Sequence, residues 1–463
     1  MFILTNNDPL PLYKQLYNQI RSHILSGKLP SEFKLPSVRE LASELSTSRN
    51  TIEGAYQELY AEGYIYSKPR SGYFVSVLDH NVIPAPISLK IHKSEPHYEP
   101  PADYRYDFHP ARLDHGSFPV VLWRKCFVEV LRGRQEYLSK YPESQGELNF
   151  RCLIRDYLER SRGVICSPEQ IVVTAGLQNG LDIVAQLLKN IHSVIAVENP
   201  GFFLPRSIFS SHSYKIVPTP VGSGGIDLEH LKAGKSTIAY VTPSHQMPMG
   251  YVMPVASRLA LIEWAASNGN FIIEDDYDSE LRYLGKPLPS LQGLQPDGNI
   301  VYIGTFSKIL SPALRVSYLV LPYSLLASYR RLYRDYSSQV SLLEQMTLAK
   351  FMELGHWERH VRRMRTLYHK KHDVCIKAID RHFGNRAVVV GQGAGLHLVL
   401  QLSGADIKEA EFIEQAGRNG IYLSPFSRII SGGESDSTYM MLGFGGMTAG
   451  EIEQGIALLS RIC

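Results

Sequence analysis

The sequence predicts a multidomain protein in which a small α+β unit at the N-terminus precedes a large α/β unit. Three observations predict this division. The first 78 residues show helical periodicity and end in two short alternating strands, a Pro-rich stretch follows, and apolar strands then alternate with helices. A chain of 463 residues also exceeds what one hydrophobic core ordinarily covers. We therefore expect domains over 1–78 and 105–463, joined by a linker over 79–104.

Composition narrows the class of protein. With 44% hydrophobic and 20% charged residues, the chain resembles folded globular proteins, and no apolar run approaches the ~20 residues that span a bilayer. The N-terminus has no basic segment before an apolar stretch, so we expect no signal peptide and a cytoplasmic protein without membrane contact. The 5 cysteines are scattered and include no CxxC pair, which argues against a disulfide framework or a metal site.

Three amphipathic helices are predicted in the first unit. In the first helix the apolar residues recur every four positions, and they are Leu12, Leu16, Ile20 and Ile24. The second helix begins after Ser37, because Glu40 three residues later completes a capping-box arrangement. The third helix follows the short link Ser46-Thr47 and has an apolar face formed by Ile52, Ala55, Tyr56 and Leu59. Gly63 is typical of the residue that ends such a helix. Two helices joined by so short a turn form a helix-turn-helix.

The third helix is the candidate element for reading double-stranded DNA. Its outward residues are Ser48, Arg49, Asn50 and Glu53. In a major groove Arg can form a bidentate hydrogen bond with guanine, and Asn can form one with adenine. Arg39 on the preceding helix is a further candidate contact. Residues 1–80 hold eight Lys or Arg and eight Asp or Glu. Any DNA binding must therefore depend on where the charges lie rather than on their number.

A hairpin is predicted after the third helix. Tyr64–Tyr66 and Tyr73–Val75 alternate in polarity around the turn Pro69-Arg70-Ser71-Gly72. The tip residues Arg70 and Gly72 are candidates for contact with a minor groove or with the phosphate backbone.

Short runs rich in β-branched residues predict the strands of the large unit. They are IVVTAG (171–176), SVIAVENPG (193–201), STIAYVTP (236–243), FIIEDDYD (271–278), NIVYIGTFSK (299–308) and VSYLVLP (316–322). Helical segments separate several of them, which indicates a largely parallel sheet covered by helices on both faces. The chain after about residue 325 begins with long helical stretches and ends in a smaller α+β pattern.

Chemically capable residues follow the ends of these strands. Lys308 comes shortly after Thr305 and Ser307, and Arg315 lies seven residues further on. A lysine amine beside hydroxyls and a guanidinium suits a Schiff base next to a phosphate. Asp275 is placed to pair with a protonated pyridine nitrogen, with Asp276 as the competing acid. Tyr277 is placed to bond a ring hydroxyl, the O3′ of pyridoxal 5′-phosphate (PLP).

Two further segments complete a candidate PLP site. The turn holding Ala175, Gly176 and Leu177 joins a strand to a helix, and a helix N-terminus is a ready phosphate site. Phe202 follows Pro200-Gly201 and is a candidate for stacking on the cofactor ring. Taken together and in this order, these residues predict PLP as the cofactor.

Several strings also resemble a known family. LPSVRELASELSTSRNTIEGAYQELYAEGYI (35–65), followed by SGYFV, resembles the signature of the GntR family of winged helix-turn-helix regulators. TPSHQMPMG (242–250), IEDDYDSELRY (273–283) and GTFSKILSPALRVSYLV (304–320) resemble the type I, aspartate aminotransferase fold and, more narrowly, the MocR subfamily of GntR regulators. The resemblance covers nearly the whole chain. It implies a winged helix-turn-helix followed by a type I PLP-dependent transferase fold with a small C-terminal α+β subdomain.

The resemblance also implies roles for single residues. Lys308 would form the Schiff base, Asp275 would bind the pyridine nitrogen and Tyr277 the O3′ atom. The phosphate would lie at Gly176, Leu177, Thr305, Ser307 and Arg315. Tyr141, in YPESQG, resembles the tyrosine that reaches the phosphate across a dimer interface, which implies a homodimer with shared cofactor sites.

The sequence departs from the aminotransferase pattern at two places. Met247-Pro248-Met249-Gly250 stands where aminotransferases carry Asn-Pro-x-Gly, so an O3′ hydrogen bond is missing, and His245 or Gln246 is the candidate substitute. Met441 stands where a carboxylate-binding Arg is usual, and Arg428 is the nearest replacement. The Tyr-x-Arg pattern of GABA-responsive members is absent near Phe202, so GABA is not the expected effector.

Three functions are compatible with these observations. The leading hypothesis is a PLP-dependent transcriptional regulator that binds an operator and senses an amino compound, or PLP itself, by aldimine formation at Lys308. The alternative is a working aminotransferase that carries a winged helix, against which the lost Asn and the displaced Arg both count. In the third, the large domain of a DNA-binding protein only dimerises and Lys308 is chemically silent.

Overall fold

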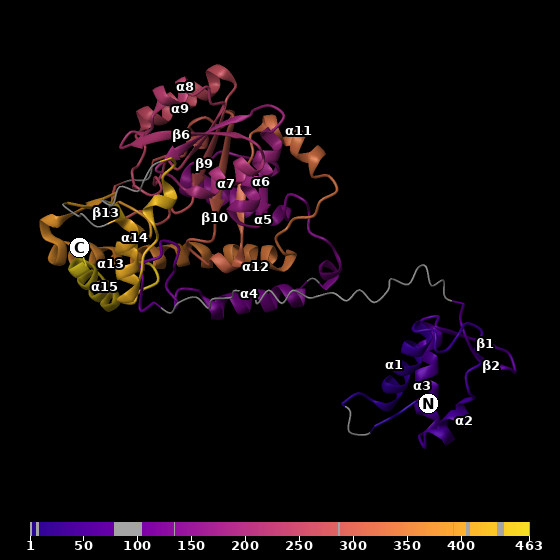
Figure 1. Cartoon of the computed structure of the whole chain (residues 1–463). Coiled ribbons are helices and arrows are strands. Elements are labelled where there is room, and N and C mark those ends of the chain that lie inside the picture. The colour runs from indigo at the N-terminus through magenta and orange to yellow at the C-terminus, as the bar shows by residue number, and fades with distance from the viewer. Residues whose placement is uncertain are drawn as a thin grey trace. The chain divides into compact units, whose positions relative to one another are not determined.

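The computed structural model divides into two compact units, Met1–Pro100 and Pro101–Cys463 (Figure 1). The residues that it describes are 2–5, 9–77, 104–133, 135–285, 288–391, 393–403, 408–432 and 439–462. The linker predicted over 79–104 lies outside these residues, apart from Tyr104. Within the described segments, no helix is both long enough and apolar enough to cross a membrane.

The N-terminal unit is a helix-turn-helix followed by a wing, as predicted. Its elements are α1 (Leu12–Leu25), α2 (Val38–Glu44), α3 (Arg49–Ala61), β1 (Ile65–Lys68) and β2 (Gly72–Val75). The two strands form an antiparallel hairpin in which Ile65 is paired with Val75. The apolar stripes of α1 and α3 pack into one core, in which Leu16, Ile20 and Ile52 are fully buried or nearly so.

Side-chain caps fix the beginnings of α2 and α3. The Ser37 hydroxyl accepts a hydrogen bond from the Glu40 N–H at 3.2 Å, and the Glu40 carboxylate accepts one from the Ser37 N–H at 2.9 Å. This is the capping box predicted from the sequence. The Ser48 hydroxyl caps α3 by accepting from the Thr51 N–H at 3.2 Å. The chain leaves α3 through Gly63, whose φ of +77° favours glycine.

The large unit is built on a mixed sheet of 8 strands in the order β4-β11-β10-β9-β8-β5-β6-β7. The strands are β4 (Ile171–Thr174), β5 (Val194–Asn199), β6 (Lys215–Gly222), β7 (Gly225–Ile226), β8 (Ile238–Val241), β9 (Phe271–Asp276), β10 (Ile300–Thr305) and β11 (Ser317–Val320). Adjacent strands from β10 to β6 are parallel, whereas β11 is antiparallel to both neighbours. The predicted largely parallel sheet is confirmed, and β6 and β7 are additional to the predicted strands.

Helices cover both faces of this sheet (Figure 1). On one face lie α6 (Gly176–Leu188), α7 (Phe203–Ser211) and α11 (Tyr323–Leu332), and on the other lie α8 (Leu228–Ala233), α9 (Val255–Asn268) and α10 (Leu291–Leu294). Successive strand residues serve opposite faces: Tyr240 packs with the first group and Ala239 with the second. Three further helices pack within the same unit, α4 (Val120–Gly133), α5 (Leu148–Arg162) and α12 (Leu342–Glu353).

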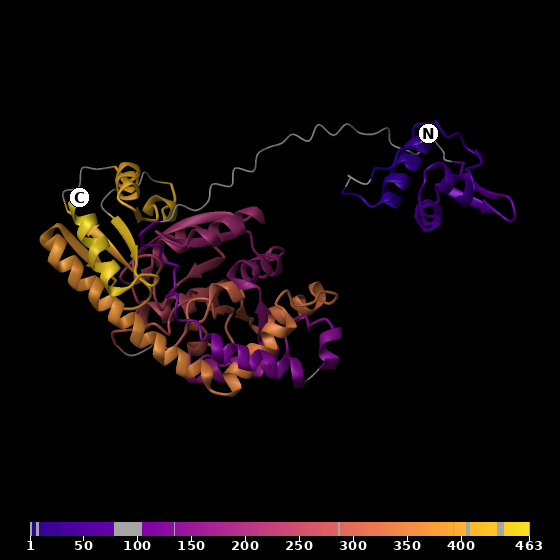
Figure 2. The same cartoon turned by 90° about the horizontal axis from the view of Figure 1, so that it is seen from below.

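The C-terminal part forms the predicted smaller α+β subdomain. A three-stranded antiparallel sheet contains β12 (Ala387–Val390), β13 (His397–Leu402) and β15 (Tyr439–Gly443). It is accompanied by α13 (His356–Phe383), α14 (Glu409–Arg418) and α15 (Ala449–Ile462), and the long α13 lies beside α15 (Figure 2). A short pair joins β3 (Tyr106–Asp107) to β14 (Ile421–Tyr422). Single 3-10 turns lie at Gln135–Ser139, Pro168–Gln170, Pro312–Leu314, Gly384–Arg386 and Phe426–Ile429.

Candidate cofactor and DNA-binding sites

A cavity of about 370 Å³ opens where the parallel strands end. Ligands of open α/β sheets ordinarily bind at this carboxyl edge. Its lining comes from the ends of β9 and β10, from loops, and from α6 and α7, and consists of Ala111, Leu177, Gln178, Phe202, Leu204, Thr242, Met247, Asp275, Tyr277, Ile303, Thr305, Ser307, Lys308, Pro312 and Arg315. The fold thus gathers Lys308, Asp275, Tyr277, Ser307 and Arg315, which were singled out in the sequence, around one hollow.

Lys308 lies in the turn that follows β10, three residues after the strand ends at Thr305. Its ammonium nitrogen is 5.9 Å from the centroid of the Tyr277 ring. Burial lowers the pKa of Lys308 from its ordinary value, although Asp278 and Asp275 act in the opposite direction. A lowered pKa increases the fraction of neutral amine, the form that attacks an aldehyde.

Two neighbouring carboxyl groups end β9, and they have different partners. Asp275 lines the cavity, is 3% exposed and accepts a hydrogen bond from the Tyr240 hydroxyl. Burial raises the pKa of Asp275 to about 7. Asp276 is engaged elsewhere, because one of its oxygens accepts from Arg162 at 2.6 Å and from the Tyr302 hydroxyl at 2.6 Å. Of the two carboxyl groups that the sequence left as alternatives, Asp275 lines the cavity and Asp276 does not.

Close packing marks the start of α6 as one end of the cavity. Gly176 has a φ of +83°, and a Cβ atom there would lie 2.3 Å from a guanidinium nitrogen of Arg315. Arg315 itself has a φ of +53° and donates to the Ala175 carbonyl at 3.4 Å. The Ala175 N–H is already taken by the Asn179 side chain at 3.0 Å. Gly176 and Leu177, at the first two positions of α6, remain candidate N–H donors at this helix N-terminus.

Hydroxyl groups also lie at the end of the cavity where α6 begins. Thr305 Oγ1 accepts from the Ser307 N–H at 3.1 Å and from the Ser317 hydroxyl at 2.8 Å, so it holds the turn that carries Lys308. Ser307 Oγ is buried and finds no hydrogen-bond partner among the described residues. Buried polar atoms are ordinarily satisfied. A guanidinium, a helix N-terminus and an unused hydroxyl together fit the phosphate of PLP.

Tyr277 is contacted by His245 rather than by Gln246. The Tyr277 hydroxyl lies 3.1 Å from Nδ1 of His245, which also lies 2.9 Å from Asp278 Oδ2. The Gln246 amide donates to the carbonyls of Pro200, at 3.0 Å, and Met247, at 2.6 Å. Gln246 therefore stabilises its own turn, and of the two candidate substitutes only His245 contacts the tyrosine.

Phe202 lies beside a second phenylalanine, which in turn contacts a basic side chain. Phe202 precedes α7 and lies 5.1 Å from the ring of Phe203, centroid to centroid. The guanidinium of Arg428 is exposed and lies 4.3 Å over the Phe203 ring. Met441, in contrast, is buried in β15. Burial lowers the pKa of His109, and the positive charges of Arg112, Lys308 and Arg428 lower it as well.

Arg206 is a functional candidate that the sequence reasoning missed. Its guanidinium donates to the carbonyls of Arg428, at 3.1 Å, and Ile430, at 3.4 Å, and contacts the Ser431 hydroxyl. It therefore anchors the segment that presents Arg428. A single basic residue on a short helix carries no sequence signal of such a role.

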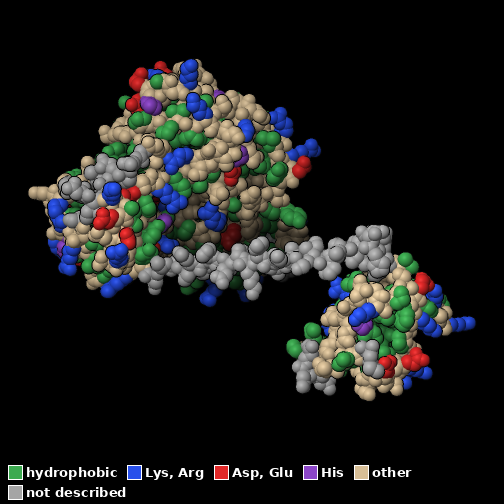
Figure 3. Space-filling model, viewed as in Figure 1, with side chains coloured by type: hydrophobic (Ala, Val, Ile, Leu, Met, Phe, Trp, Pro, Cys, Tyr) green, Lys and Arg blue, Asp and Glu red, His purple; other side chains and the backbone are tan. Residues whose placement is uncertain are grey.

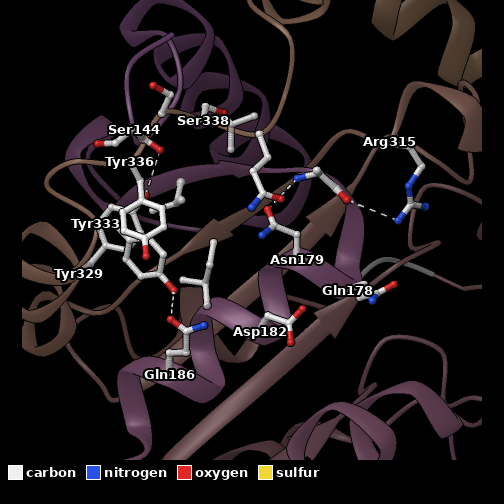
Figure 4. A pocket seen from close by; sticks show the side chains of 16 residues that line it. Ser144, Gln178, Asn179, Asp182, Gln186, Arg315, Tyr329, Tyr333, Tyr336 and Ser338 are labelled. Atoms are coloured by element: carbon white, nitrogen blue, oxygen red, sulfur yellow. Dashed lines mark hydrogen bonds between the residues drawn. The ribbon is translucent and has the colours of Figure 1, made fainter. Parts of the chain in front are cut away.

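A second hollow of about 390 Å³ shares Arg315 and Gln178 with the cavity that Lys308 lines, called the cofactor cavity below (Figure 4). Its wall contains a row of tyrosines from α11 and the segment after it. Tyr329 donates to the Ser144 carbonyl at 3.0 Å and Tyr333 to Gln186 at 2.7 Å. Tyr141, predicted to reach a phosphate across a dimer interface, is 89% exposed and lines neither of these two hollows.

The candidate DNA-contacting residues all lie on the surface of the N-terminal unit, and they are Arg39, Ser48, Arg49, Asn50, Glu53, Arg70 and Gly72. The Ser48 hydroxyl is engaged as the helix cap, whereas Arg49 and Asn50 occupy the first turn of α3. Glu32 holds the wing through the Tyr66 hydroxyl at 2.7 Å and Lys68 at 3.2 Å. On the face visible in Figure 3, basic and acidic side chains of this unit are interspersed.

Comparison with known proteins identifies two families along the chain. Residues 12–75 match the gntR family of bacterial regulatory proteins, and residues 112–456 match the aminotransferase class I and II family. The chain is 39% identical to YdeL of Bacillus subtilis (strain 168), an HTH-type transcriptional regulator, over 97% of this chain and 96% of that protein. It is 33% identical to MocR, the probable rhizopine catabolism regulatory protein of Rhizobium meliloti, over 92% of this chain and 89% of MocR.

The large unit also has relatives of known structure. Pyrococcus horikoshii kynurenine aminotransferase superposes with a TM-score of 0.71 and 22% sequence identity, over 78% of this chain and 90% of that chain. At this identity the likeness establishes the fold, which is that of the type I PLP-dependent transferases.

Proposed function

The chain belongs to the MocR subfamily of GntR-type transcriptional regulators, and on that basis we propose that it senses an amino compound, or PLP itself, at Lys308. The observation that carries the proposal is the convergence of Lys308, Asp275, Tyr277 and Arg315 on one cavity in a chain that also holds a helix-turn-helix. The effector would act by changing the DNA affinity of the N-terminal unit.

The residues around the cavity fit PLP. When bound, the cofactor supplies an aldehyde for covalent attachment to a lysine and a ring that withdraws electrons. Lys308 would hold the aldehyde carbon, Asp275 the pyridine nitrogen and Tyr277 the ring hydroxyl. Arg315, the Ser307 hydroxyl and the N-terminus of α6 would hold the phosphate, with Phe202 beside the ring.

An effector with a free amine would compete with Lys308 for the cofactor. Arg428 is the candidate for binding a carboxylate on that effector. Its guanidinium is exposed, and the charges of Arg428 and Lys308 both lower the pKa of His109. Arg206 would position it. We expect the protein to act as a cytoplasmic homodimer in which two copies of α3 contact two operator half-sites.

Covalent trapping tests the proposal. Purified full-length protein is incubated with PLP, reduced with borohydride and digested, and the modified lysine is identified by mass spectrometry. We expect modification at Lys308 and no absorbance band of lysine-linked PLP in Lys308→Ala, while Lys377→Ala, which removes an exposed lysine of α13, behaves as wild type. Trapping of Lys308→Ala at another lysine would refute the assignment.

A working aminotransferase remains the second candidate, because the cavity contains the lysine, acid and phenol that transamination uses. Incubation of the PLP-bound protein with common amino acids, together with a 2-oxo acid as the amino-group acceptor, separates the two functions. Conversion of the cofactor to its amine form with repeated turnover indicates an enzyme, whereas a spectral change that reverses when the amino acid is removed indicates a sensor.

A further inference from the structure

We propose that Asp278 and His245 form a positioning pair that keeps the hydroxyl hydrogen of Tyr277 free for the cofactor. The inference deepens the proposed function and rests on PLP binding at Lys308. Neither residue lines the cavity, so both would act through Tyr277.

His245 and Asp278 are buried, and His245 contacts Tyr277. His245 is 1% exposed and Asp278 is 2% exposed. The single atom Nδ1 of His245 lies 2.9 Å from Asp278 Oδ2 and 3.1 Å from the Tyr277 hydroxyl. The other ring nitrogen, Nε2, is buried and has no hydrogen-bond partner among the described residues.

These contacts determine where the ring proton lies. A neutral imidazole carries one proton, and a buried carboxylate oxygen at hydrogen-bond distance requires a donor. With the proton on Nε2, two lone pairs would face each other across 2.9 Å at Nδ1. The proton therefore lies on Nδ1 and is donated to Asp278. A protonated Nδ1 cannot accept, so the Tyr277 hydroxyl keeps its own hydrogen for another acceptor.

Packing around His245 and Asp278 restricts their side-chain orientations. A Cβ atom at Gly395 would lie 2.3 Å from His245 Cε1 and 2.6 Å from Asp278 Oδ2, so the backbone of this loop presses on both side chains. The Gly395 carbonyl is itself held by the Tyr283 hydroxyl at 2.6 Å. Packing of this kind fixes side-chain orientation.

Other titratable groups also face the tyrosine and its histidine. His397, on β13, has its ring centroid 5.3 Å from that of His245 and contacts the Pro248 carbonyl at 3.0 Å. Lys308 faces Tyr277 from the turn after β10. The charges of Asp275, Asp276 and Glu198 also act on Tyr277. None of these groups replaces the 2.9 Å carboxylate contact at Nδ1.

The predicted consequence is measurable as a pH titration. A hydroxyl that donates to the cofactor's ring oxygen withdraws negative charge and weakens proton binding at the lysine–cofactor link. The absorbance band of bound PLP changes with protonation of that link. In Asp278→Asn the amide can donate to Nδ1, which moves the ring proton to Nε2 and turns Nδ1 into an acceptor that competes for the Tyr277 hydrogen.

We therefore expect the pH midpoint of the PLP absorbance change to rise by about 0.5–1 unit in Asp278→Asn. The direction of the midpoint shift distinguishes this mechanism from the effect of losing the Asp278 charge alone. Loss of the Asp278 negative charge alone would destabilise a protonated link and lower the midpoint. A midpoint that is lowered or unchanged in Asp278→Asn overturns the proposal.

Two further variants test whether the effect passes through both side chains. Tyr277→Phe should raise the midpoint by itself, and Asp278→Asn should cause no further rise in the Tyr277→Phe or His245→Phe background. A rise of equal size in the His245→Phe background, or an unchanged midpoint in Tyr277→Phe, contradicts the proposal. The Tyr277→Phe result stands even if an Asp278 variant fails to fold.

The matched control is a histidine–carboxylate pair distant from the cavity. His382 Nε2 lies 2.9 Å from Glu453 Oε1 on the C-terminal subdomain, and Glu453→Gln should leave the midpoint unchanged. Failure of the proposed function would look different, because wild-type protein would then show no lysine-linked PLP band to titrate.

Discussion

Two adjacent aspartates at the end of β9 lead to opposite predictions. Asp275→Asn should weaken PLP binding about 10- to 100-fold, since a charge-assisted hydrogen bond contributes ~1.5–3 kcal/mol, with little change in folding. Asp276→Asn should instead destabilise the large unit by ~3–5 kcal/mol, because it breaks a buried ion pair with Arg162. PLP titration by absorbance and denaturant unfolding measure the two effects. Equal loss of PLP affinity in both folded variants would contradict this division.

The residues of the candidate site could be predicted where their order along the chain constrained them, whereas their side-chain contacts could not. Asp275, Tyr277 and Lys308 could be singled out because each lies at or just after the carboxyl end of β9 or β10, and Arg315 because it precedes the antiparallel β11, which begins at the same edge of the sheet. The choice between Asp275 and Asp276 depended on Arg162, which is more than a hundred residues away in the sequence. The Asp278–His245 contact likewise joins two loops. No local pattern predicts such pairs.

Helix α3 supplies the element-scale prediction. Arg49 is exposed in its first turn, whereas Ile52 and Tyr56 are buried. Arg49→Ala should cost ~1–3 kcal/mol of operator binding and narrow the preference for operator over random DNA, because a bidentate base contact is lost. The measurement is a titration of labelled operator and random duplex with full-length protein. PLP absorbance should be unchanged, since the cofactor cavity lies in the other unit.

Gln57→Ala is the matched control for Arg49→Ala, since it also truncates an exposed polar residue of α3 but lies two turns further along the helix. It should bind operator as wild type does. Wild-type binding by Arg49→Ala would remove this residue from the recognition surface. Loss of both PLP and DNA binding would indicate damage to the fold.

Elements were predictable where periodicity was clear. The stripes of α1 and α3 and the capping box of α2 place those helices to within a residue or two, because local spacing alone decides them. Strand β6 escaped prediction because Pro218 and Pro220 interrupt it and its residues are mostly exposed or half-buried. Its pairing with β5 depends on tertiary contacts that a strand pattern does not contain.

At the scale of the whole molecule, the two-unit division follows from composition and length, whereas assembly does not. Tyr141 is 89% exposed, and Tyr336, beside the hollow that adjoins the cofactor cavity, is 61% exposed. Large exposed aromatic residues are typical of interaction surfaces. These residues support the homodimer expected from the family resemblance, in which Tyr141 of one subunit would serve the cofactor site of the other.

Mixed dimers test whether Tyr141 acts between subunits. Tyr141→Ala homodimers should bind PLP several-fold more weakly than wild type, because each phosphate loses a hydrogen bond of about 1 kcal/mol or more, and Lys308→Ala homodimers should show no lysine-linked band.

A heterodimer of one Lys308→Ala and one Tyr141→Ala subunit then distinguishes the arrangements. If the tyrosine acts across the interface, the Lys308-bearing cavity receives an intact Tyr141 from its partner, and half of the sites bind PLP with wild-type affinity. If the tyrosine acts within its own subunit, no cavity in the heterodimer is intact and every PLP-binding site shows the weakened affinity. A stable monomer in analytical ultracentrifugation of the PLP-bound protein at micromolar concentration would contradict the shared site altogether.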